Sequence, residues 1–217
     1  MAGCHQCASE AVTDADRRDP RFRRVLWFAL VTNAVMFAVE LIASFVSGSV
    51  SLQADALDFF SDAVNYAVTL FVLGMSLHAR AKAALFKGAT MALFGLWVIG
   101  NALYRATVGT VPDAEMMGVI GLLALVANAS VALMLYRYRS GDSNMRSIWL
   151  CSRNDALGNI AVMLAAGGVF ATTSGWPDIA VAALIATLSL SAAFQVIQQA
   201  SSELRSEPHL SEPAHKT

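Results

Sequence analysis

Charged side chains are scarce in this sequence. Asp, Glu, Lys and Arg make up 14% of its 217 residues, whereas soluble domains normally carry about 25%. Hydrophobic residues account for 56% of the chain, and its mean hydropathy is positive. The composition therefore predicts a membrane protein and argues against a soluble domain.

Two further shortages exclude other classes. The formal net charge is −1, so the chain lacks the basic excess expected of a nucleic-acid-binding protein. It has three cysteines, too few for a disulfide framework. The first apolar segment is too long for the hydrophobic part of a signal peptide, and no small-residue cleavage site follows it. We therefore predict no signal peptide.

Six apolar segments follow a polar head. Each is close to the roughly 20 residues that cross about 30 Å of hydrocarbon, so we predict an all-α membrane protein, a bundle of six transmembrane helices. The segments lie at residues 25–46, 52–77, 84–107, 116–136, 147–171 and 177–201. The chain then divides into an unstructured N-terminal tail (1–24), a transmembrane domain (25–201) and a short C-terminal tail (202–217).

The basic residues predict the orientation of this bundle. Five arginines precede the first segment, and Arg80, Lys82 and Lys87 are assigned to a basic turn after the second. Three more arginines follow the fourth segment, whereas only Arg105 would face the opposite side. By the positive-inside rule, both termini are expected in the cytoplasm.

Three aspartates interrupt the second segment. Asp55, Asp58, Asp62 and Asn65 are three or four residues apart, which places them on one face of a helix. A single charge at bilayer depth costs at least about 2.5 kcal/mol, so this face predicts a polar cavity or a bound cation. A hydrophilic turn between two shorter helices is the alternative, although no Gly or Pro breaks the run.

The fifth segment carries a matching polar stripe. Cys151, Asp155 and Asn159 are four residues apart, and in an antiparallel bundle they reach a depth similar to that of the first stripe. If the stripes face each other, Asp58, Asp62, Cys151 and Asp155 supply the four ligands of a tetrahedral divalent site. The alternatives are that the carboxylates line a water-filled cavity and that Cys151 is a small buried hydrophobe.

Other polar residues give weaker signals. Asn33 and Glu40 share one face of the first segment, where Asn33 either lies beside an ion route or makes a packing hydrogen bond, and Glu40 requires a partner. Asp178 begins the sixth segment and is expected to cap that helix. The head offers soft metal ligands for metal capture at Cys4, His5 and Cys7, but one such motif is also compatible with a dispensable tail.

These motifs resemble the cation diffusion facilitator family over roughly residues 33–201. The resemblance implies a secondary transporter, not an enzyme, that exports divalent metal ions from the cytoplasm in exchange for protons and carries no prosthetic group. It also implies an integral protein of a bacterial inner membrane. The matching features are Asn33, Glu40, residues 49–52, Ala54-Asp55-Ala56, Asp58-x-x-x-Asp62, Cys151-x-x-x-Asp155 and Trp176-Pro177-Asp178.

The chain departs from the family pattern in two places. Cys151 stands where members often carry His, and the softer thiolate favours Zn²⁺ or Cd²⁺, with Co²⁺ and Ni²⁺ also open, over Mn²⁺ or Mg²⁺. Members commonly end in a soluble metal-binding domain that supports a dimer. Only residues 202–217 follow the last segment here, so that domain is expected to be absent, and a homodimer would form through the transmembrane helices.

Two other functions remain open at this point. A bundle with internal acids also suits a non-transporting membrane metal sensor or scaffold, or a proton-coupled exporter of small organic cations. The second class uses buried carboxylates but has no use for a thiol.

The predicted metal ligands would exchange protons for the metal ion, because aspartates and a cysteine bind a metal only after their protons have left.

Overall fold

The computed structural model describes residues 20–71, 77–136 and 143–205; within them, the side chains at positions 77, 80 and 143–154 are not described. All regular structure in these ranges is α-helical. The helices are α2 (Pro20–Ser47), α3 (Val50–Phe71), α4 (Leu77–Val108), α5 (Ala114–Tyr136), α6 (Ser143–Thr172) and α7 (Trp176–Arg205). The all-α prediction is confirmed.

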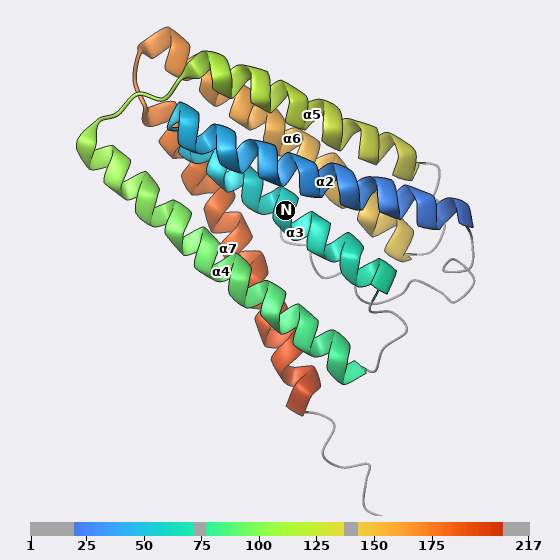
Figure 1. Ribbon diagram of the computed structural model, residues 1–217. Helices are drawn as coiled ribbons and strands as arrows, with labels where there is room; N and C mark the ends of the chain where they lie inside the picture. Colours follow the sequence, from blue (N-terminus) through green and yellow to red (C-terminus); the bar gives the residue numbers. More distant parts are fainter. Residues whose placement is uncertain (1–19, 72–76, 137–142, 206–217) are drawn as a thin grey trace, which may run out of the picture.

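The helices pack as three antiparallel pairs with α3 at the centre. α4 lies along α7, α5 along α6, and α2 along α3 (Figure 1). α3 also packs against α4, α6 and α7, so its side chains can meet residues from most of the bundle. The start of α2 and the end of α7 lie at the same end of the molecule (Figure 1).

Five of the six described helices are long and apolar enough to cross a membrane. The remaining helix, α3, is not a clear span, because three aspartates fall within its 22 residues. Its central position explains how it tolerates them: neighbouring helices cover the polar face. That α3 itself crosses the membrane stays a prediction.

Several predicted boundaries differ from the observed helices, among them the end of the second segment and the start of the first. The second segment was extended to residue 77, but Leu77 begins α4 and α3 is described only to Phe71. The first helix begins at Pro20, ahead of the predicted residue 25, and proline is well tolerated in a first helical turn. Phe22 accounts for the extra turn, because it is 1% exposed and packs in one cluster with Tyr66 of α3.

Small side chains let α7 approach its neighbours closely. The buried positions of α7 are mostly Ala and Ser. Across the interface, a Cβ atom on Gly88 of α4 would lie 2.7 Å from the Cγ1 atom of Ile197. Such contacts are typical of membrane helices, where packing rather than hydrophobic exclusion holds helices together. Large apolar side chains such as Phe86 and Phe170 point outward.

The start of α3 is held by a carboxylate from α7. Asp178, 1% exposed, accepts hydrogen bonds from the Ser49 hydroxyl at 2.6 Å and from the backbone N–H groups of Val50 at 2.8 Å and Ser51 at 3.0 Å. The expectation that Asp178 caps its own helix was wrong, because these bonds all go to α3. The bonds fix the register of α3 relative to α7, and so the position of the acidic face.

Candidate functional site

The structure brings together one aspartate from each predicted stripe. Asp62 of α3 and Asp155 of α6 are hydrogen-bonding neighbours through their carboxyl groups. Both side chains are partly buried. Two carboxyl groups this close require a proton or a cation between them, because two adjacent carboxylates repel each other. The pair therefore marks a place where protons and metal ions can compete.

A lysine lies beside this pair. Lys87 of α4 is 4% exposed, donates a hydrogen bond to the Oδ1 atom of Asn65 and acts electrostatically on Asp62. Its assignment to a basic turn was wrong, because the residue lies inside helix α4 and its side chain is buried. The ammonium group supplies a fixed positive charge at the edge of the carboxyl pair.

Asp58 lies one helical turn from Asp62 and has a different partner. Its Oδ1 atom accepts a hydrogen bond of 2.9 Å from the Ser189 hydroxyl of α7. Among the residues whose side chains are described, no three His, Cys, Asp or Glu side chains converge as metal ligands. Of the four predicted ligands, the structure thus joins Asp62 with Asp155 and places Asp58 beside α7.

The cysteine predictions fall outside the described part of the structure. Cys151 belongs to α6, one turn before Asp155, but its side chain is among those not described. The tail residues Cys4, His5 and Cys7 also lie outside the described ranges. A thiolate ligand and metal capture by the head therefore stay predictions.

A buried chain of amides leads to Asp55. The Nδ2 atom of Asn128 in α5 donates to the Oδ1 atom of Asn159 in α6 at 2.8 Å. In turn, the Nδ2 atom of Asn159 donates to the Oδ2 atom of Asp55 at 2.7 Å. All three residues are at most 5% exposed. Asn128 was not among the predicted site residues, although an amide within the otherwise apolar fourth segment marks it in the sequence.

Glu40 reaches the same region from α2. It is 0% exposed, and its closest electrostatic neighbours are the acids Asp55 and Asp58. The carboxyl groups of Glu40 and Asp55 interact directly through a side-chain hydrogen bond, and no other described side chain or N–H group donates to Glu40. Asn33 behaves differently: its Nδ2 atom donates to the Ala29 carbonyl of its own helix at 2.8 Å, the packing bond that was one of its two expected roles.

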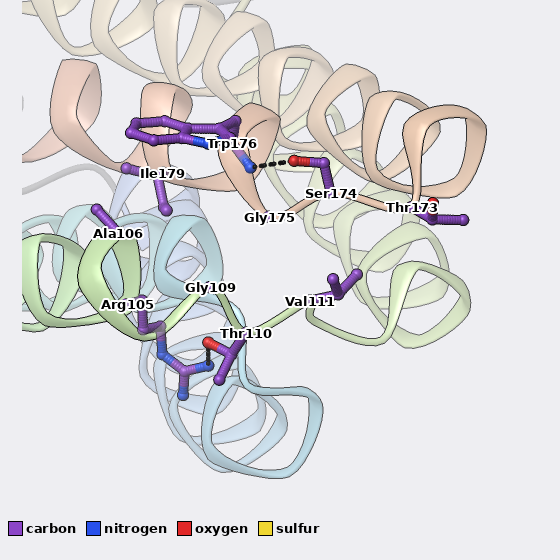
Figure 2. A pocket seen from close by; sticks show the side chains of 10 residues that line it. All are labelled: Arg105, Ala106, Gly109, Thr110, Val111, Thr173, Ser174, Gly175, Trp176 and Ile179. Atoms are coloured by element: carbon purple, nitrogen blue, oxygen red, sulfur yellow. Dashed lines mark hydrogen bonds between the residues drawn. The ribbon is translucent and has the colours of Figure 1, made fainter.

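A pocket of about 130 Å³ lies at the end of the bundle where α3 begins, away from these acids. It is formed by the connections α4–α5 and α6–α7 (Figure 2). Its polar lining includes Arg105 and Thr110, joined by a hydrogen bond of 3.3 Å, and Ser174 (Figure 2). None of the predicted ligands lines it, so we do not assign the acidic site to this pocket.

Comparison with known proteins adds a family match. The sequence pattern of the cation efflux transmembrane domain matches residues 26–205. The chain is 26% identical over 190 residues to the cadmium, cobalt and zinc/H(+)-K(+) antiporter of Bacillus subtilis, covering 80% of this chain and 60% of the relative. It is 25% identical over 219 residues to the zinc transporter ZitB of Escherichia coli, covering 94% and 68%.

A third relative is the metal cation efflux system protein CzcD of Cupriavidus metallidurans. It is 24% identical to this chain over 174 residues, which cover 75% of the chain and 55% of the relative. The chain thus spans between 55% and 68% of the length of these three proteins.

Proposed function

The chain belongs to the cation efflux family, and we propose that it is a secondary transporter that exports divalent transition-metal ions, Zn²⁺ or Cd²⁺ foremost, in exchange for protons. It is an integral membrane protein with several apolar helices. The names of its relatives support this choice of ions, since they specify cadmium, cobalt and zinc or zinc alone. Co²⁺ and Ni²⁺ remain further candidates.

The Asp62–Asp155 pair is the observation that carries this proposal. The two carboxyl groups come from different helices and meet within the bundle. In the absence of metal, a proton between them removes their repulsion. A divalent cation binds carboxylates only in their ionised form, so metal entry expels that proton. One site therefore binds both species and cannot hold both at once.

We propose Asp58, Asp62, Cys151 and Asp155 as the metal ligands. Asp58 lies on the same helix face as Asp62, and a metal ion would take the place of the Ser189 hydroxyl at its Oδ1 atom. Cys151 lies one turn from Asp155 on α6, the spacing that puts two side chains on one face. Three carboxylates are hard oxygen ligands and the thiolate is a soft sulfur ligand. This combination suits Zn²⁺, and the sulfur also favours Cd²⁺.

The membrane arrangement is part of the proposal. We place six spans in a bacterial inner membrane, with both termini cytoplasmic and α3 as the least apolar span. The packing of α3 against α2, α4, α6 and α7 supports this view, because these neighbours cover its acids. A homodimer through the transmembrane helices stays a prediction.

Uptake into proteoliposomes tests the function. Vesicles containing the purified protein are given Zn²⁺, Cd²⁺, Co²⁺ or Ni²⁺, with and without an imposed pH gradient. We expect Zn²⁺ and Cd²⁺ uptake that rises when the vesicle interior is acidic. Binding without any uptake would favour a metal sensor or scaffold, and uptake of small organic cations instead of metals would favour the other alternative.

Lys87→Met is expected to tighten metal binding. The ammonium group of Lys87 acts on the same carboxylate that binds the metal, so the two positive charges repel each other. Removing it should raise Zn²⁺ affinity about tenfold, which corresponds to about 1.4 kcal/mol, and should slow metal release. Isothermal titration and uptake rates measure both, with Lys87→Arg as the charge-conserving control. Unchanged or weaker Zn²⁺ binding in Lys87→Met would contradict this role.

Cys151→His is expected to change the order of preferred ions. Imidazole is a harder ligand than thiolate, so Cd²⁺ should lose more affinity than Co²⁺ or Ni²⁺. Competition binding of the four ions to wild type and variant measures the order. If the order is the same in both proteins, Cys151 is not a ligand.

A further inference from the structure

Ser189 of α7 donates its hydrogen bond to another helix. Several hydroxyl groups in the described helices donate to a backbone carbonyl in the preceding turn of their own helix, which is a common way for a helix to accommodate a hydroxyl group. Thr187, two residues before Ser189, does so to Ala183 at 2.6 Å. The Ser189 hydroxyl, 3% exposed, instead donates to the Oδ1 atom of Asp58 in α3 at 2.9 Å.

This bond accounts for the position of Asp58. Asp58 shares a helix face with Asp62, yet among the residues whose side chains are described no three potential metal ligands converge. α3 packs against both α6 and α7. The Asp62–Asp155 pair joins α3 to α6, whereas Ser189 joins Asp58 to α7. The third carboxylate is therefore held by a different helix from the one that completes the pair.

We infer that Ser189 is a positioning residue of the metal site, which holds Asp58 while the site is empty and releases it to the metal ion. This inference rests on the proposed function, in which Asp58 is a ligand. When the metal takes the Oδ1 atom, the Ser189 hydroxyl can turn back to the carbonyl of Ile185, four residues earlier in α7, as Thr187 does to Ala183. The hydroxyl then keeps a partner inside the bundle.

The exchange affects how tightly the metal is held. Metal binding breaks one hydrogen bond between helices, so removal of the hydroxyl takes this cost out of the binding equilibrium. Such a bond between membrane helices changes an equilibrium constant about threefold on average, and a charged acceptor makes it stronger. Ser189→Ala is therefore expected to raise Zn²⁺ affinity at least about threefold and to slow metal release.

Zn²⁺ binding and uptake test this role. Isothermal titration compares wild type with Ser189→Ala and with Ser189→Thr, which keeps the hydroxyl group. Ser189→Ala should bind Zn²⁺ more tightly, and in proteoliposomes its KM and kcat for uptake should fall together, because a more tightly held ion leaves more slowly. Ser189→Thr should return these values towards those of wild type. Simple damage to the packing of α7 would raise KM instead.

Two controls separate this contact from its surroundings. Ser191→Ala removes an exposed hydroxyl from the same helix and should behave as wild type does. In an Asp58→Ala background, the further change Ser189→Ala should leave the remaining Zn²⁺ affinity unaltered, because Ser189 acts only through Asp58. This comparison does not depend on Ser189→Thr, whose extra methyl group must fit a buried position.

Tighter Zn²⁺ binding in Ser189→Ala that disappears in the Asp58→Ala background supports the inference. The inference is overturned if Ser189→Ala binds Zn²⁺ as wild type does or more weakly, or if its effect persists without Asp58. Wild type that binds Zn²⁺ and loses it in Asp62→Asn shows that such a failure belongs to Ser189 alone. If wild type binds no Zn²⁺, the proposed function fails and this inference fails with it.

Discussion

Asp62→Asn is expected to abolish metal transport while the bundle remains folded. The substitution conserves the size of the side chain and removes one of the two charges at the α3–α6 contact. Loss of residues that merely orient metal ligands costs 10–100-fold in affinity, so loss of a ligand should weaken Zn²⁺ binding by at least about a hundredfold. Folding should be unimpaired, because the amide N–H of the new side chain can donate to the Asp155 carboxylate in place of the shared proton.

Isothermal titration with Zn²⁺ and proteoliposome uptake measure this effect, and circular dichroism checks the fold. Asp155→Asn should behave in the same way, because both residues belong to one pair. Glu115→Gln, which removes an exposed carboxylate, should bind and transport normally. Wild-type Zn²⁺ affinity in both Asp62→Asn and Asp155→Asn would show that the pair is not the metal site.

Asp178→Ala is expected to give the largest loss of stability. The change leaves the Ser49 hydroxyl and the N–H groups of Val50 and Ser51 without their acceptor in a buried place. A buried donor left without its acceptor typically costs about 1–3 kcal/mol, so the three donors together should cost at least about 3 kcal/mol. In a chain of this size, such a loss lowers Tm by roughly 10 °C. Asp178→Asn, which keeps one acceptor oxygen, should lose less.

Asp113→Ala provides the matched control for this experiment. Asp113 also accepts two backbone N–H bonds at a helix start, those of Glu115 and Met116, but its side chain is exposed. Loss of such a cap costs about 1 kcal/mol. Thermal unfolding in one detergent compares the variants directly. If Asp178→Ala is no less stable than Asp113→Ala, the contact between α7 and α3 does not hold the bundle in register.

The features that depend on local pattern could be predicted from the sequence. The length of an apolar segment and the spacing of polar residues on a helix are properties of neighbouring positions, so six helices and an acidic face on α3 followed from them. The approach of Asp62 to Asp155 required only that antiparallel helices place matched stripes at similar depth. The structure brings these two side chains together.

Contacts between distant residues could not be predicted in this way. Lys87 was counted as a charge outside the membrane, but a tertiary hydrogen bond to Asn65 keeps it buried. Asp178 carries the usual signal of a helix cap and serves a different helix, because α7 packs beside the start of α3. In both cases the side chain is placed by a partner that lies far away in sequence.

Proton release on metal binding tests the central claim most directly. Purified protein in weakly buffered detergent solution is titrated with Zn²⁺ while a pH indicator records the protons that leave. We predict at least one proton for each Zn²⁺ bound by wild type, and neither binding nor release in Asp62→Asn. Stoichiometric Zn²⁺ binding without proton release would contradict exchange of metal and proton at the Asp62–Asp155 pair.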